Sequence, residues 1–129
     1  MNTLVLVPMD QSYVPVLDTI KEALSERSIE PILIDKVFSP SVVWSNAVTN
    51  AIQVADLIVA DVSRKNVLYE LGFAHALRKP TLLLVSTEEK GDMPFDLTAY
   101  QIIPYDPKDL SPLRRQIQRF LDYQQTKLL

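Results

Sequence analysis

The sequence predicts a doubly wound α/β domain, in which helices cover both faces of a sheet of about five mostly parallel strands. Short apolar runs alternate with amphipathic segments along the whole chain, which is typical of parallel strands linked by crossover helices. The runs are continuous, as expected for strands buried on both faces. A chain of 129 residues suits one core, so we expect a single domain over residues 1–129.

The first half of the chain follows the order strand, helix, strand, helix. Residues 3–7 are an apolar, β-branched run and are expected to form a strand. Residues 14–27 carry an apolar stripe at helical spacing. A second short strand is expected at 31–34. Serines on both sides of a proline at 39–41 are suited to starting a helix, which is expected to continue to residue 54.

The second half repeats the alternation and closes with one more strand and helix. A third strand is expected at 56–60, followed by a helix at 66–78 that begins with an asparagine cap and ends at Lys-Pro. The fourth strand is expected at 81–85 and a short fifth at 101–103. A closing helix is expected at 111–123, with a proline in its first turn.

Four acidic residues map to the edge of the sheet where ligands are expected. Right-handed crossovers bring the carboxyl ends of the strands to one edge, and open α/β sheets bind ligands there. Asp10, Asp61, Glu70 and Asp96 lie at this edge or just beyond it. Glu70 is expected near the start of its helix, where the helix dipole stabilises a carboxylate.

Glu70 has both a catalytic and a structural interpretation. A carboxylate among the apolar neighbours of this segment can attack an electrophilic sugar carbon or stabilise an oxocarbenium-like cation. A glutamate in the first turns of a helix can equally be a structural residue that complements the dipole. Asp61 and Asp10 can hold a ribose hydroxyl or manage a proton, and they can also be simple turn formers.

The composition excludes several other kinds of chemistry. The chain has no cysteine, which removes disulfides, thiolate nucleophiles and thiolate metal ligands. Gly72 and Gly91 are too far apart to form a dinucleotide fingerprint or a P-loop. We expect no cofactor and no metal. The net charge of −3 with scattered basic residues argues against a nucleic-acid partner. No apolar run has the length of a membrane span, and no signal peptide is recognisable, so we expect a cytoplasmic protein without a membrane partner.

A phosphoacceptor receiver domain is a further interpretation, because Asp10 and Asp61 follow the first and third strands. Such a domain needs a second acid beside Asp10 and a lysine at the end of a later strand. Met9 and Gln11 flank Asp10, and Val-Ser-Thr ends the fourth strand. The receiver interpretation is therefore disfavoured.

Several stretches carry a family resemblance that covers nearly the whole chain in order. ADLIVADVS, NVLYELGFAHAL and KPTLLLVS resemble the nucleoside 2-deoxyribosyltransferase-like and TIR-like superfamily of prokaryotes. The start, LVLVPMDQSYVPVLDTIKEAL, resembles the opening of the TIR-like nucleotide-binding branch. MPFDLTAYQIIPYD resembles the later "PFDL…Y" segment of that branch. The resemblance implies a flavodoxin-like fold.

The resemblance also implies roles for individual residues. In the transferases the glutamate of the "ELG" element attacks the anomeric carbon, and in TIR enzymes a helical glutamate supports cleavage of the nicotinamide–ribose bond of NAD. Glu70 matches that position, which makes it the catalytic candidate. The substrate-binding candidates, from the resemblance and from their place at the sheet edge, are Met9, Asp10, Tyr13, Asp61, Ser63, Asn66, Tyr69 and Asp96.

Two functions remain open. The first is cleavage of an N-glycosidic bond, or transfer of its sugar, on a nucleoside, nucleotide or NAD-like substrate. Such a protein is a nucleoside deoxyribosyltransferase or a nucleotide or NAD glycohydrolase. The second is a non-catalytic, nucleotide-sensing or self-assembling TIR-like module in defence or signalling, working as a homo-oligomer. The SRKN turn between Asp61 and Glu70 is shorter than in most family members, which favours the second function.

Overall fold

The computed structural model describes residues 1–8, 11–33, 42–63, 68–88 and 102–128 of the chain. Within these residues, five strands form one sheet in the order β2-β1-β3-β4-β5, and every neighbouring pair is parallel. The strands are β1 Thr3–Leu6, β2 Pro31–Leu33, β3 Leu57–Asp61, β4 Thr81–Ser86 and β5 Ile102–Tyr105. The predicted parallel, flavodoxin-like sheet is confirmed.

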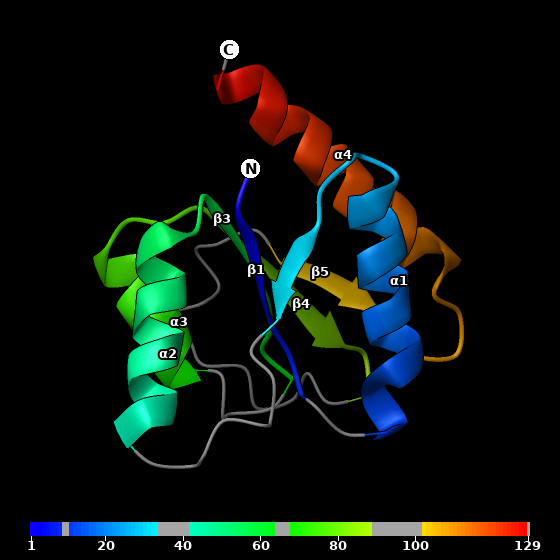
Figure 1. Ribbon diagram of the computed structural model, residues 1–129. Coiled ribbons are helices and arrows are strands. Elements are labelled where there is room, and N and C mark those ends of the chain that lie inside the picture. Colours follow the sequence, from blue (N-terminus) through cyan, green and yellow to red (C-terminus); the bar gives the residue numbers. More distant parts are fainter. Residues whose placement is uncertain (9–10, 34–41, 64–67, 89–101, 129) are drawn as a thin grey trace.

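Helices cover both faces of the sheet (Figure 1). The helices α1 (Val14–Ser25) and α4 (Ser111–Leu128) lie together on one face, and α2 (Val42–Val54) and α3 (Leu68–Ala76) lie on the other. No helix in the described part of the chain is both long and apolar enough to cross a bilayer.

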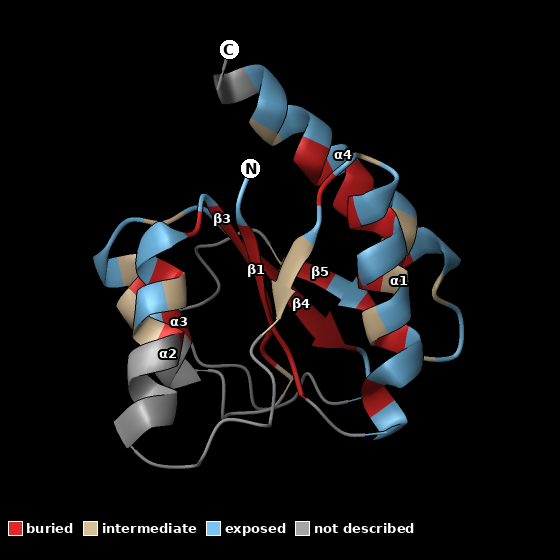
Figure 2. Cartoon of the chain, viewed as in Figure 1, coloured by how far each residue is buried: buried red, intermediate tan, exposed pale blue. Residues whose placement is uncertain are grey.

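The register of the strands divides the core into two layers. Successive strand residues point to opposite faces. Leu57 and Val59 of β3 pack with α1 and α4, whereas Ile58 and Ala60 pack with α2 and α3. All four are at most 1% exposed, and the three central strands β1, β3 and β4 form the buried centre of the sheet (Figure 2). The alternation turns Asp61, the last residue of β3, toward the layer of α1 and α4.

The end of β5 differs from the prediction. The expected strand stopped at residue 103, directly before Pro104, and a proline cannot donate to the hydrogen-bond ladder of a sheet. In the structure β5 continues through Pro104 to Tyr105. Among the described strands it lies at the edge of the sheet and pairs with β4 alone, and edge strands tolerate proline. The extension brings Tyr105 to the carboxyl end of the strand.

The closing helix is longer than predicted. It was expected to end at residue 123, and α4 runs to Leu128. The sequence after Tyr123 contains no proline or glycine that would end a helix. The inner face that packs on the sheet consists of Leu113, Ile117, Phe120 and Leu121.

The helix α1 ends in a Schellman motif whose left-handed residue is a serine. Ser28 has a φ of 61°, and its N–H donates to the carbonyl of Ser25 at 3.0 Å. The N–H of Ile29 donates to the carbonyl of Leu24 at 3.0 Å. A left-handed conformation costs a residue with a Cβ about 1–2 kcal/mol, and glycine avoids that cost. We therefore expect Ser28→Gly to raise the free energy of unfolding by about 0.5–1 kcal/mol.

Urea unfolding of paired variants checks this expectation. Ser25→Gly is the matched control, because it makes the same change inside the last turn of α1 and is expected to cost about 0.5 kcal/mol. The two glycines should shift the unfolding midpoint in opposite directions. A shift of both in the same direction would show that the conformation of Ser28 carries no strain.

Candidate functional site

The carboxyl ends of β1 and β3 lie where the direction of the crossovers reverses. β1 lies between β2 and β3 in the sheet. The chain leaves β1 for α1 on one face and leaves β3 for α3 on the other (Figure 1). Open α/β sheets bind ligands at such a switch point. The candidate site therefore lies at the carboxyl edge, between β1 and β3.

A buried carboxylate lies at this edge. Asp61 has no exposed surface. Its Oδ2 accepts hydrogen bonds from the hydroxyls of Tyr13, at 2.5 Å, and Tyr105. Its Oδ1 accepts the backbone N–H of Ser63 at 2.8 Å. Burial of a carboxylate is costly unless hydrogen bonds replace those to water, and three donors do so here. We call these four residues the Asp61 network.

The two tyrosines come from distant parts of the chain. Tyr13 ends the short 3-10 helix η1 (Gln11–Tyr13), directly before α1, and Tyr105 ends β5. They are 6% and 5% exposed, and both belong to the apolar cluster beneath α1 and α4. The network thus ties the start of α1 and the end of β5 to the end of β3.

Serine side chains extend the network to β4. The Oγ of Ser63 accepts the backbone N–H of Ser86 at 2.7 Å, and the Oγ of Ser86 accepts the N–H of Glu88 at 3.2 Å. Ser86 is the last residue of β4. The turn after β3 is therefore bound both to Asp61 and to the end of the neighbouring strand.

Both tyrosines of the network hold their protons tightly. Burial is the largest cause that raises the pKa of each hydroxyl, and the negative charge of Asp61 is the second. Both pKa values lie well above the usual value of about 10. Tyr13 and Tyr105 therefore remain hydrogen-bond donors to Asp61 at neutral pH.

These raised pKa values predict a loss of stability in alkali. Tyrosines of the unfolded chain ionise near pH 10, while Tyr13 and Tyr105 keep their protons in the folded state. Above pH 10 the folded state then binds more protons than the unfolded state. The free energy of unfolding therefore keeps its full value below pH 10 and falls as the pH rises above it. The two tyrosines together contribute a slope of up to about 2.7 kcal/mol per pH unit to this fall in the free energy of unfolding.

Tyrosinate absorbance, recorded with circular dichroism, measures this effect. Tyr123, which is 62% exposed, provides the signal of an exposed tyrosine for comparison. Tyr13→Phe and Tyr105→Phe identify the two buried contributions, which should appear only as the fold is lost. Ionisation of either one near pH 10 in the intact fold would contradict the expectation.

The structure brings together part of the predicted site. Tyr13, Asp61 and Ser63 meet in the network. Tyr69 and Glu70 are the second and third residues of α3, and the structure describes only the backbone of these two residues. The roles predicted for their side chains stay predictions. The remaining candidates lie outside the described residues: Met9, Asp10, Asn66 and Asp96.

The Asp61 network and α3 lie on opposite faces of the sheet. The tyrosines pack beneath α1 and α4, whereas α3 packs on the other face through Leu71 and Ala74. Because α3 follows β3, its start and the first-turn residue Glu70 lie toward the carboxyl edge. The network and the helix thus approach this edge from two sides. Asp61 has no exposed surface and its Oδ2 accepts both tyrosine hydroxyls, so that oxygen can contact a ligand only if a tyrosine moves.

Sequence reasoning missed Tyr105. Its predicted strand ended before Pro104, so Tyr105 was left beyond the sheet. The signal that could have found it is the position of this strand as the last in the parallel order. The last strand can be an edge strand, in which proline is tolerated. A strand continued through Pro104 brings Tyr105 to the same edge as Asp61.

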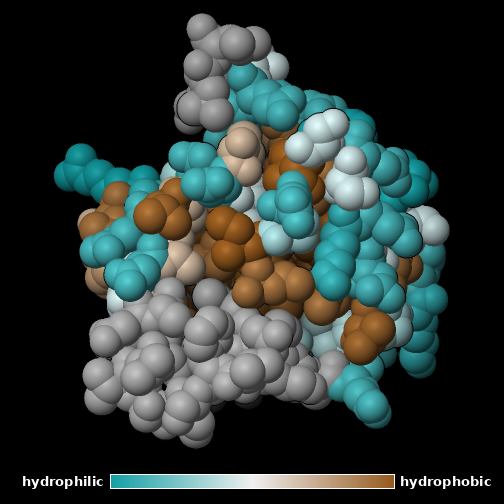
Figure 3. All heavy atoms as spheres, viewed as in Figure 1, coloured by the Kyte–Doolittle hydropathy of each residue, from teal (hydrophilic) through white to brown (hydrophobic). Residues whose placement is uncertain are grey.

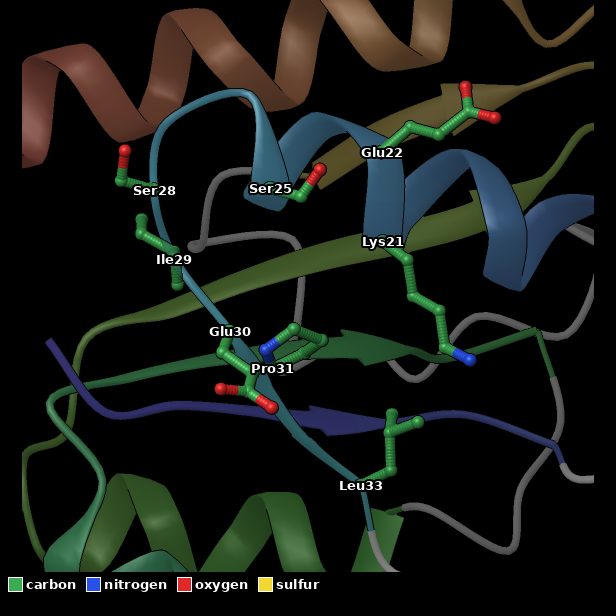
Figure 4. A pocket seen from close by; sticks show the side chains of 8 residues that line it. All are labelled: Lys21, Glu22, Ser25, Ser28, Ile29, Glu30, Pro31 and Leu33. Atoms are coloured by element: carbon green, nitrogen blue, oxygen red, sulfur yellow. The ribbon is translucent and has the colours of Figure 1, made fainter.

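An open groove of about 600 Å³ lies elsewhere, between α1 and the edge strand β2 (Figure 4). Lys21, Glu22 and Glu30 line it with charges of both signs. Apolar side chains gather in the middle of the view in Figure 3, over the exposed edge of the sheet formed by β2. Much of the lining, at residues 28–31, precedes or begins β2, so the groove does not coincide with the carboxyl edge between β1 and β3. Among the described residues, no three acidic or histidine side chains gather to hold a metal.

The sheet order and the position of the candidate site define a doubly wound, flavodoxin-like α/β protein. No protein-family model and no curated protein matches the chain. Solved structures, in contrast, do match the chain. The chain is similar to the CMP N-glycosidase BcmB of Clostridium botulinum, with a TM-score of 0.62 and 19% identity over 95% of this chain and 98% of that chain.

A second similar structure is the TIR domain of the Toll-related receptor TRR-2 from Hydra magnipapillata. The TM-score is 0.67, with 13% identity over 93% of this chain and 97% of that chain. The two similarities confirm the expected resemblance at the level of the fold, which a glycosidase and a TIR domain share. A shared fold does not by itself define an activity.

Proposed function

We propose that the protein cleaves the N-glycosidic bond of a nucleoside, nucleotide or NAD-like substrate, or transfers its sugar, with Glu70 as nucleophile or cation stabiliser. The observation that carries this proposal is the place of Glu70 in the first turn of α3, after the carboxyl end of β3. The start of a helix favours an anionic carboxylate. Such a carboxylate can attack an anomeric carbon or stabilise positive charge on the sugar.

The similarity to a CMP N-glycosidase supports the proposed substrate class. Breaking an N-glycosidic bond develops positive charge on the sugar ring, and a carboxylate can stabilise that charge without a metal or a thiol. The chain has no cysteine and a single histidine, so carboxylates are its best-suited reactive groups. Met9, Asp10, Asn66, Tyr69 and Asp96 remain the proposed substrate contacts.

In this proposal the Asp61 network supports the site and does not react. Among the described residues, Asp61 accepts hydrogen bonds from Tyr13, Ser63 and Tyr105, and it has no exposed surface. We therefore assign Asp61 to holding Tyr13 and the turn at Ser63 in place. Buried, fully hydrogen-bonded groups of this kind keep the surrounding backbone in one arrangement.

Release of a free base tests the proposal. The protein is incubated with CMP, dCMP, a set of deoxynucleosides and NAD, and the products are separated by chromatography. Release of base from at least one substrate, absent with heat-denatured protein, is the expected result. Adding a second free base separates transfer, which yields a new nucleoside, from hydrolysis, which does not. No release from any member of the panel would count against catalysis.

A non-catalytic, nucleotide-sensing or self-assembling module is the second candidate function. The similarity to a TIR domain favours it. This function predicts calorimetric binding of a nucleotide without turnover, together with an increase in molar mass measured by light scattering when the nucleotide is added. Turnover of the same nucleotide would exclude it.

A further inference from the structure

Tyr105 reaches Asp61 from a strand that is not its neighbour. β4 lies between β3 and β5, and yet the Tyr105 hydroxyl donates to Oδ2 of Asp61. The ring itself is packed in the apolar cluster beneath α1 and α4. A phenylalanine has nearly the same shape and would fill the same space. The hydroxyl of Tyr105 therefore has a role other than packing.

The two tyrosine hydroxyls fix the orientation of the carboxylate. Oδ2 accepts both of them, which uses the two lone pairs of that oxygen. With Oδ2 held between Tyr13 and Tyr105, the carboxylate cannot rotate freely. Oδ1 is thereby kept 2.8 Å from the backbone N–H of Ser63.

The turn at Ser63 lies on the path to the catalytic candidate. It follows β3, and the chain continues from it toward α3, in which Glu70 is the third residue. The turn is fixed on one side by Asp61 and on the other by the hydrogen bond from Ser86. The orientation of the Asp61 carboxylate thus bears on where the chain leaves the sheet for α3.

We propose that Tyr105 is a positioning residue of the carboxyl-edge site, acting through Asp61 on the turn at Ser63, from which the chain continues toward α3. The inference rests on the proposed function. Removing only the hydroxyl frees one lone pair of Oδ2 and lets the carboxylate turn, which loosens the turn at Ser63. Loss of orientation in a reacting group lowers the rate of the chemical step more than it weakens substrate binding.

Tyr105→Phe tests the proposal through kinetics. We expect kcat to fall by about 10-fold while KM stays within about 2-fold, the pattern for an interaction that matters in the transition state. Tyr123→Phe is the matched control, because Tyr123 is exposed on α4 and its loss should leave both constants unchanged. A rise in KM at constant kcat, or unchanged constants in both variants, overturns the proposal.

Hydrogen exchange gives a readout that does not depend on activity. The Ser63 amide should exchange about 10-fold faster in Tyr105→Phe than in the wild type. The neighbouring Val62 amide, which donates to the carbonyl of Leu84 at 2.8 Å, should keep its rate. Unchanged exchange at Ser63, or equal acceleration at both amides, overturns the proposal.

The exchange comparison also separates the two proposals. If the wild type releases no base, the proposed function fails, and the exchange rate of Ser63 still decides whether Tyr105 positions the turn. Tyr13→Phe removes the other donor to the same oxygen and serves if Tyr105→Phe does not fold. The same selective acceleration at Ser63 is expected from it, and its absence counts against the proposal.

Discussion

Replacing Glu70 with glutamine is expected to lower kcat by at least about 100-fold while the Kd of the substrate changes little. Glutamine keeps the shape of the side chain and its hydrogen-bonding oxygen, but it has no negative charge and is a poor nucleophile. Glu70 lies in the first turn of α3, after the carboxyl end of β3. A carboxylate there contributes to the reaction chiefly when positive charge develops on the sugar.

Single-turnover kinetics measures the rate of the chemical step, and calorimetry on the same preparations measures the Kd of the substrate. Glu30→Gln is the matched control. Glu30 is exposed and directly precedes β2, so the variant removes the same charge away from the carboxyl edge between β1 and β3. Its turnover should equal that of the wild type. Equal turnover by Glu70→Gln would refute the role assigned to Glu70.

Replacing Asp61 with alanine is expected to lower the free energy of unfolding by about 3–5 kcal/mol. The change leaves two buried donors, the hydroxyls of Tyr13 and Tyr105, and one partly buried donor, the N–H of Ser63, without their acceptor. Each unpaired buried group costs about 1–3 kcal/mol. For a domain of this size, the fall in Tm is roughly 10–20 °C.

A combined variant shows whether the cost comes from the unpaired donors. Asp61→Leu together with Tyr13→Phe and Tyr105→Phe removes the two hydroxyls along with their acceptor and leaves the N–H of Ser63 unpaired. It is expected to be markedly more stable than Asp61→Ala, since replacing all partners with apolar groups can be nearly neutral. A loss below about 1 kcal/mol in Asp61→Ala would show that the carboxylate does not hold the network together.

The fold could be predicted because its signals are local. Continuous apolar runs identify strands buried on both faces, and their alternation with helices implies a parallel sheet. The errors arose at the ends of elements, and at the end of β5 a local rule met a tertiary exception. Pro104 ended the predicted strand, yet the edge position of β5 tolerates it.

The arrangement of the site depends on information that the local pattern does not contain. Tyr13 and Asp61 were both selected because each lies at a carboxyl end, but the hydrogen bond between them joins residues 48 positions apart. It forms because the register of β3 turns Asp61 toward the layer of α1 and α4. The register also separates the Asp61 carboxylate from the layer of α3, so Asp61 and the helix that carries Glu70 approach the edge from different faces.

A crystal structure of Glu70→Gln with the nucleotide or nucleoside that the wild type cleaves tests the place of the reaction most directly. We expect the sugar at the carboxyl edge between β1 and β3, with its anomeric carbon within about 3.5 Å of the substituted side chain. A sugar bound instead in the groove between α1 and β2, or at the carboxyl edge with its anomeric carbon turned away from α3, would contradict a reaction carried by Glu70.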